Sequence, residues 1–104
     1  MKVAICQYDM RWEDAASNLR TVERLVERAD ADLVVLPEMF STGFKLHASV
    51  VAEPMSGPTI AAMREWSRRY GKAIVGSVVI VDDEGRFRNR QFFVKPSGEM
   101  TWYD

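Results

Sequence analysis

The feature that most constrains the fold is a pair of short apolar runs separated by an amphipathic segment. Residues 3–6 and 33–36 are continuous apolar runs, a pattern typical of strands in a sheet that is covered on both faces. Between them, apolar residues recur at helical spacing from 15 to 29, and mostly arginine and glutamate fill the other positions. A strand, helix, strand order of this length predicts a right-handed crossover between two parallel strands.

A second helix is predicted in the stretch SGPTIAAMREWSRRYGK. Pro58 suits the first helical position, and Gly71 stands where a C-terminal cap belongs. The apolar stripe of this helix consists of Ile60, Met63, Trp66 and Tyr70.

Three further strands follow this helix. Residues 73–81 form a long, mostly β-branched run that reads as a buried strand. The DDEG turn at 82–85 returns the chain as a strand through residues 87–95. The PSGE turn at 96–99 then leads into a last strand at residues 100–104.

The predicted fold class is α/β with a mixed central sheet. Parallel strands need cover on both faces and partners on both sides, and two helices with about five strands leave apolar sheet unpaired. We therefore interpret residues 1–104 as the N-terminal portion of a larger, here incomplete, domain. The isolated chain is expected to self-associate or aggregate.

Composition narrows the classes of function. The 14 Lys and Arg against 15 Asp and Glu give a net charge of -1 without a basic run, which argues against nucleic acid or anionic membrane as a partner. The N-terminus has no secretory signal pattern, and no stretch is long enough to span a bilayer. One cysteine fits a reducing, cytoplasmic location, and with one histidine it cannot make a structural zinc site. We expect no metal.

One acid follows the second apolar run directly, in the stretch VVLPEMFSTGF at 34–44. Open α/β sheets place their ligand crevices beyond the carboxyl ends of parallel strands, and Pro37 fixes the backbone before Glu38. A partly buried carboxylate at this place would suit a general base that works near neutral pH. The alternative is a solvated loop acid or a helix cap.

The chain contains, in order, VAICQYD, DLVVLPEMFSTGF, a Gly-Pro helix start and AIVGSVVIVDDEGRFRNRQFFVKPSGEMTWYD. Together these pieces resemble the N-terminal part of the nitrilase, or carbon-nitrogen hydrolase, superfamily. LPEMFSTGF is similar to the omega-amidase-like branch, whose members hydrolyse the side-chain amide of 2-oxo acid amides. The hairpin with Asn89 and the closing WYD are similar to the strands that lead into the family's catalytic lysine.

The resemblance implies a four-layer αββα sandwich and a Glu, Lys and Cys triad. Glu38 aligns with the general base, which takes the thiol proton and later activates the hydrolytic water. The lysine stabilises the oxyanion, and the route needs no metal or organic cofactor. In the family the lysine follows directly after the position of Asp104, and the cysteine lies further on, so this chain alone is expected to be inactive.

Other candidate residues have weaker support. Cys6 lies in the first predicted strand and is expected to be a core residue, not the nucleophile. Lys72 and Lys95 do not match the family's lysine position and are expected to be solvated or snorkelling. His47 is interpreted as an exposed loop residue. Phe44 is predicted to line the mouth of the substrate pocket, with core packing as the alternative.

Two functions follow from these patterns. The resemblance predicts that the parent protein hydrolyses a carbon-nitrogen bond in a small amide, such as a 2-oxo acid amide, and forms homo-oligomers. The alternative is a non-catalytic α/β module whose open sheet edge pairs with another chain.

Overall fold

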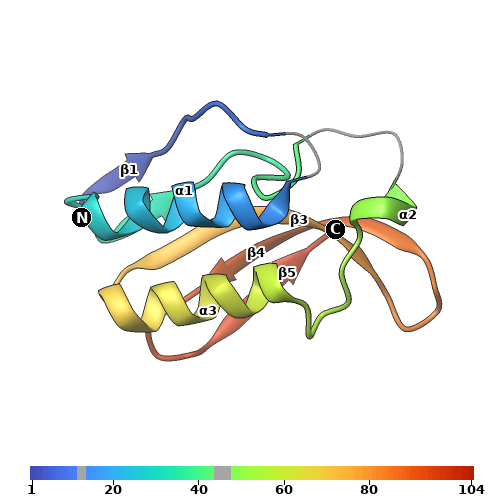
Figure 1. Ribbon diagram of the computed structural model, residues 1–104. Coiled ribbons are helices and arrows are strands. Elements are labelled where there is room, and N and C mark those ends of the chain that lie inside the picture. The colour runs from blue at the N-terminus through green and yellow to red at the C-terminus, as the bar shows by residue number, and fades with distance from the viewer. Residues whose placement is uncertain (12–13, 44–47) are drawn as a thin grey trace.

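The computed structural model describes residues 1–11, 14–43 and 48–104 as a layer of strands with helices on one face (Figure 1). Within these residues the elements are β1 (Val3–Ile5), α1 (Ala15–Arg28), β2 (Leu33–Val35), α2 (Ala48–Val51), α3 (Pro58–Tyr70), β3 (Ala73–Val81), β4 (Phe87–Val94) and β5 (Met100–Tyr103). The strands lie side by side in sequence order. β1, β2 and β3 pair in parallel, whereas β3, β4 and β5 pair antiparallel. The predicted mixed α/β sheet is confirmed.

The core lies between the sheet and the two longer helices. The side chains of α1 and α3 that follow the helical stripe are buried against alternate residues of β2, β3 and β4. These core residues are Val22, Val26, Val34, Ile60, Met63, Trp66, Ile74, Val78, Ile80, Phe92 and Val94. Burial of this stripe, rather than helix propensity, holds the helices on the sheet.

The first strand differs from its prediction. Val3 is 52% exposed and Ile5 is 75% exposed, so β1 is not covered on both faces. The reason is its place at the edge of the sheet: Ala4 pairs with the helix-facing Val34, so Val3 and Ile5 lie on the face opposite to α1 and α3. An apolar run signals a strand, but it does not say which of its faces the rest of the fold covers.

Both long helices have well-defined ends. The Asp14 carboxylate caps α1 by accepting a hydrogen bond from Ser17 N at 3.1 Å. At the other end Lys72 Nζ donates to the carbonyl oxygens of Val26 (2.6 Å) and Glu27 (3.0 Å). Lys72 therefore caps the C-terminus of α1, a more specific contact than the solvated or snorkelling role expected for it.

The loop predicted before α3 contains the four-residue helix α2, which is too short to give a periodic pattern. After it, Glu53 fastens the segment to the sheet: its N–H donates to Val79 O (3.0 Å) and its carbonyl accepts from Val81 N (2.9 Å). The buried Glu53 carboxylate accepts from both Thr59 N (2.8 Å) and the Thr59 hydroxyl. This carboxylate thereby satisfies the first turn of α3, whose Pro58 start is confirmed.

Gly57 is required by this cap, and Gly57→Ala is expected to destabilise the protein by about 1–3 kcal/mol. An added Cβ would lie 2.6 Å from Glu53 Oε1 and 2.9 Å from Pro54 O, so the capping carboxylate would have to move. Urea unfolding followed by tryptophan fluorescence measures the loss. The neighbouring exposed Ser56, changed to alanine, serves as control and should stay within about 0.5 kcal/mol of wild type. Equal stability of the two variants would contradict the role of Gly57.

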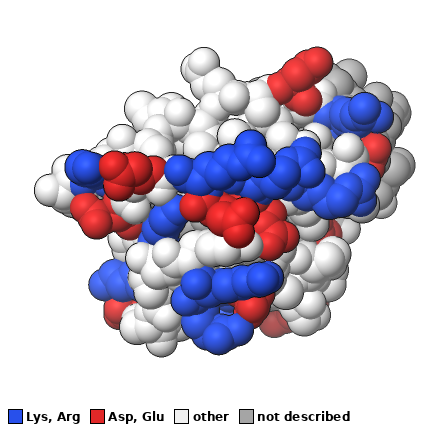
Figure 2. Space-filling model, turned by 60° about the vertical axis from the view of Figure 1, so that its left-hand side comes forward, with Lys and Arg blue, Asp and Glu red and all other residues white. Residues whose placement is uncertain are grey.

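The solvent side of α1 and α3 carries interleaved charges, seen as adjoining blue and red side chains in Figure 2. Glu23 on α1 accepts from the Tyr70 hydroxyl (2.8 Å) and pairs with Arg69 (3.7 Å), which links the two helices. The hydrogen bond to Glu23 raises the pKa of Tyr70 above its usual range. Among the described residues, no helix has the length and apolar character needed to cross a membrane.

Candidate active site

A cavity of about 350 Å³ lies beside the carboxyl end of β2. Its lining comes from the turn after β2 and from the three successive strands β3, β4 and β5, with Asp104 just beyond the end of β5. The lining residues are Leu36, Glu38, Gly76, Ser77, Asn89, Gln91, Tyr103 and Asp104. The predicted functional acid is therefore one wall of a cavity that is otherwise rich in hydrogen-bonding side chains.

Glu38 is held by a side chain from the distant hairpin. Its Oε1 accepts a hydrogen bond from Asn89 Nδ2 at 2.6 Å. In the part of the protein that the structure describes, Glu38 is exposed, unlike the partly buried carboxylate that would suit a general base.

The backbone next to Glu38 is strained and tied down. Met39 has a φ of 50°, in the left-handed region that non-glycine residues rarely adopt. Its N–H donates to Ser77 Oγ at 2.7 Å, and its carbonyl accepts from Gly43 N at 2.8 Å. Ser77 was not singled out from the sequence, although a polar residue inside the run AIVGSVVIV was a usable signal. A buried hydroxyl in such a strand needs a partner, and here the partner is the turn that carries Glu38.

The turn is anchored beyond Met39 as well. The Phe40 ring is fully buried, 6.5 Å from the ring of Trp66 and directly over Gly76. The Phe40 carbonyl accepts a hydrogen bond from the Tyr8 hydroxyl, and the Ser41 carbonyl accepts from Asn18 Nδ2 at 2.7 Å. The turn that carries Glu38 is therefore fixed to the segment after β1, to α1 and to β3.

Two titratable groups after β1 have raised pKa values. Burial raises the pKa of the Tyr8 phenol, and neighbouring Cys6 adds to the rise, so the phenol stays a neutral donor to Phe40. Burial also raises the pKa of the Cys6 thiol. A thiol with a raised pKa forms little of the reactive thiolate. Cys6 lies just after β1 rather than inside it, and its N–H donates to Val35 O at 2.9 Å.

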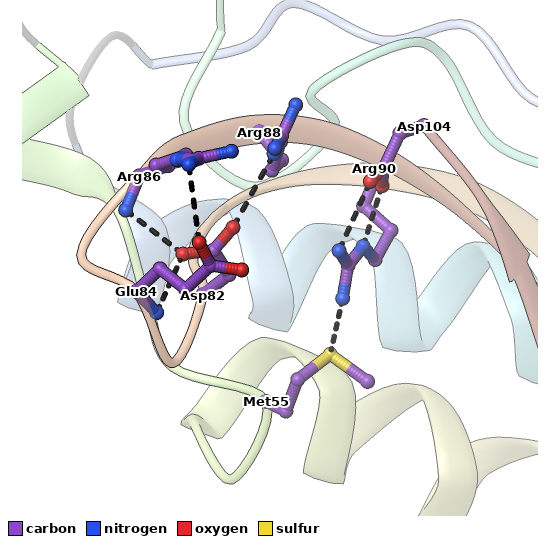
Figure 3. A network of polar contacts seen from close by, with 7 residues as sticks. All are labelled: Met55, Asp82, Glu84, Arg86, Arg88, Arg90 and Asp104. Carbon is purple, nitrogen blue, oxygen red and sulfur yellow. Dashed lines mark hydrogen bonds and ion pairs between the residues drawn. The ribbon is translucent and has the colours of Figure 1, made fainter.

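On the other face of β4, Arg90 fixes the end of β5 (Figure 3). Its guanidinium donates to Asp104 Oδ1 at 2.5 Å and to Oδ2 at 3.0 Å, contacts Met55 Sδ at 3.6 Å and lies 5.6 Å from the centroid of the Trp102 ring. This bidentate pair holds the pKa of the Asp104 carboxyl below its usual range. Side chains alternate along a strand, so Asn89 faces the cavity while Arg90 faces the helices.

The turn between β3 and β4 is also ordered by a carboxylate (Figure 3). Asp82 Oδ1 accepts from Arg86 N and Glu84 N, both at 2.9 Å, and Oδ2 lies 3.4 Å from Arg88 Nε. The backbone hydrogen bond from Arg86 is the main cause of the lowered pKa of Asp82. This turn fixes the register of the hairpin, in which Asn89 pairs with Val79.

The remaining predicted residues are not at the cavity. Phe44 and His47 fall outside the described residues, so the prediction for Phe44 is untested. Lys95 forms an exposed ion pair with Glu99 at 3.0 Å in the turn between β4 and β5, away from the cavity lining. In the described part of the chain, no group of three or more His, Cys, Asp or Glu side chains is placed to hold a metal ion.

The chain is similar in sequence to known proteins over nearly all of its length. The sequence profile of the carbon-nitrogen hydrolase family matches residues 2–104. Omega-amidase YafV of Yersinia enterocolitica is 38% identical over 105 residues, which cover 100% of this chain and 40% of that protein. An (R)-stereoselective amidase of a Pseudomonas species is 36% identical over 107 residues, covering 99% of this chain and 39% of the relative.

Among solved structures, XC1258 of Xanthomonas campestris superposes with a TM-score of 0.93 at 38% identity, over 100% of this chain and 40% of that one. It is described as a member of the same superfamily with an arsenic adduct in its active site. The chain thus spans about 40% of the length of these relatives. The match across nearly every residue shows that the chain belongs to the carbon-nitrogen hydrolase family.

Proposed function

We propose that the protein containing this chain hydrolyses a carbon-nitrogen bond in a small amide, with Glu38 as the general base. The observation that carries the proposal is the placement of Glu38 on the cavity, with one carboxylate oxygen held by Asn89 at 2.6 Å. A general base must be fixed within hydrogen-bond reach of the proton that it removes. The 38% identity to an omega-amidase supports an amide as the substrate class.

The proposed reaction uses Glu38 twice. The carboxylate takes the proton of a cysteine thiol, and the thiolate attacks the amide carbonyl carbon. The tetrahedral oxyanion is stabilised by a lysine cation. It collapses to a thioester as the protonated Glu38 gives its proton to the amide nitrogen, which leaves as ammonia. The Glu38 carboxylate then removes a proton from water, whose oxygen attacks the thioester carbon; the acid product leaves, and the proton passes to the cysteine sulfur, which restores the thiol. We propose that the lysine and the cysteine belong to a part of the protein outside residues 1–104, which form the N-terminal portion of the domain.

The cavity supports a polar substrate of small size. Ser77, Asn89, Gln91 and Tyr103 supply hydroxyl and amide groups, and its volume of about 350 Å³ is at the lower end for ligand pockets. We propose a 2-oxo acid amide, in which carboxylate and carbonyl oxygens would use such donors.

The direct test is ammonia release by the complete gene product from a 2-oxo acid side-chain amide, with an aliphatic nitrile and an N-carbamoyl compound as comparison substrates. We expect turnover of the 2-oxo acid amide with the highest kcat/KM of the three. The intact mass of the native protein is measured alongside the assay. A mass about two and a half times the 11.9 kDa of this chain agrees with relatives of which it covers 40%.

A second candidate is a non-catalytic module that assembles through its uncovered sheet face. On that face Val3, Ile5 and Tyr103 are 52%, 75% and 78% exposed. A partner chain that covers these apolar side chains would remove them from water. A native mass of 11.9 kDa, a stable oligomer in light scattering and no amide turnover would support the module and contradict the hydrolase.

A further inference from the structure

We propose that Asn89 is a positioning residue that holds the Glu38 carboxylate in its working orientation. This inference rests on the proposed hydrolase function and adds a residue to it. Asn89 Nδ2 donates to Glu38 Oε1 at 2.6 Å across 51 positions of sequence. In the hydrogen bonds of the described residues, Glu38 Oε2 has no protein donor, so one oxygen is held and the other is available for proton transfer.

The support behind Asn89 is rigid. Asn89 pairs with Val79 in the centre of the β3–β4 ladder, and the Asp82 turn closes the same hairpin. One position further along, Arg90 is fixed to the opposite face by its bidentate pair with Asp104. The donor is therefore mounted on a strand, which gives better precision than a loop.

Because Glu38 is exposed, its side chain needs a donor to hold it in one orientation. Without such a donor, a glutamate side chain samples several rotamers, and selecting the single rotamer that the reaction needs costs conformational entropy. A short hydrogen bond to a carboxylate is charge-assisted and directional, so it fixes the orientation of the oxygen that accepts it. Because the asparagine amide is neutral, it orients the base without competing for the proton.

The charged and titratable neighbours of Glu38 are few among the described cavity residues. They are Tyr103 and Asp104 at the end of β5. Asp104 is already paired with Arg90, and the pKa of this carboxyl is held below its usual range. The polar contacts from β3 and β4 come from Ser77, Asn89 and Gln91, which do not titrate. Asn89 is the residue of this set whose hydrogen bond to Glu38 is observed.

The test compares pH profiles of kcat and kcat/KM for the complete gene product and two Asn89 variants. Asn89→Ala should lower kcat about ten- to hundredfold with little change in KM. Asn89→Asp is isosteric, and its loss should grow as pH rises: a proton shared by the two carboxyl groups restores the hydrogen bond, whereas two ionised carboxylates repel.

Gln91→Ala is the matched control, because Gln91 lies two residues along the same strand and lines the same cavity without an observed bond to Glu38. Its effect should be the same factor at every pH. A loss of kcat in Asn89→Ala, together with a loss in Asn89→Asp that grows with pH, supports the inference. Uniform losses, or none, in both variants of an active enzyme would overturn it.

A second readout does not depend on turnover. In protein labelled with ¹³C in its glutamate side chains, the mobility of the Glu38 side chain is followed by NMR relaxation. Its order parameter should be lower in Asn89→Ala than in wild type, and an unchanged order parameter contradicts the inference even if the protein proves inactive on amides. Absence of wild-type turnover with a lowered order parameter would reject the proposed function and leave the positioning role supported.

Discussion

Replacing Glu38 by glutamine in the complete gene product is expected to lower kcat/KM for a 2-oxo acid amide about a thousandfold. The glutamine oxygen can still accept the hydrogen bond from Asn89 Nδ2, so the geometry of the turn survives. The neutral amide cannot take a proton, however, and both the attack of the thiol and the attack of water need a base. The loss should lie in kcat, since the shape of the cavity is preserved.

Two controls separate proton transfer from folding. Glu99→Gln removes an exposed acid that pairs with Lys95 away from the cavity, and it should keep wild-type kcat/KM. Alkylation of the active thiol by iodoacetamide at neutral pH should slow in Glu38→Gln but not in Glu99→Gln, because the thiolate fraction depends on the base. Wild-type turnover in Glu38→Gln would remove Glu38 from the proposed mechanism.

The two longer helices and the longest strand could be predicted from the sequence because their signals are local. Pro58 and Gly71 predict the two ends of α3 to within one helical turn. Gly71 has a φ of 66°, the left-handed conformation that a C-terminal helix cap requires. The β-branched run Ala73–Val81 is β3 residue for residue. Each of these signals depends on a residue's own backbone preference, which the sequence states directly.

The site could be predicted only in part, because its other half depends on register. Glu38 was identified from its place after a buried strand, a local signal. Its partner Asn89 is 51 positions away along the chain, and Ser77 is 38 positions from its own partner Met39. The pairing of β3 with β4 brings Asn89 and Ser77 to the same cavity. A shift of one residue in that pairing would turn Asn89 to the helix face. The Asp82 turn and the burial of Phe92 and Val94 oppose such a shift, but the sequence does not state which residues of this hairpin lie beside the turn after β2.

The turn that carries Glu38 is also held by the core, through Phe40. Phe40→Ala is expected to lower the free energy of unfolding by about 3–5 kcal/mol. Its ring is fully buried beside Trp66 and over Gly76, so truncation leaves a cavity that the sheet cannot close. Urea unfolding followed by tryptophan fluorescence measures the loss. Phe40→Leu keeps most of the buried volume and should lose much less.

Gly76 gives a sharper test of the same contact. A Cβ on Gly76 would lie 3.0 Å from Phe40 Cδ1 and 3.1 Å from Phe40 Cε1, and the buried ring has no room to withdraw. Gly76→Ala alone should therefore destabilise the protein by about 1–3 kcal/mol. In the Phe40→Ala background the ring is gone and the added methyl enters the vacated space, so the second substitution should cost less or even stabilise. Strict additivity of the two losses would mean that Phe40 does not rest on Gly76. The backbone of the turn would then depend on the bonds to Tyr8, Ser77 and Asn18 alone.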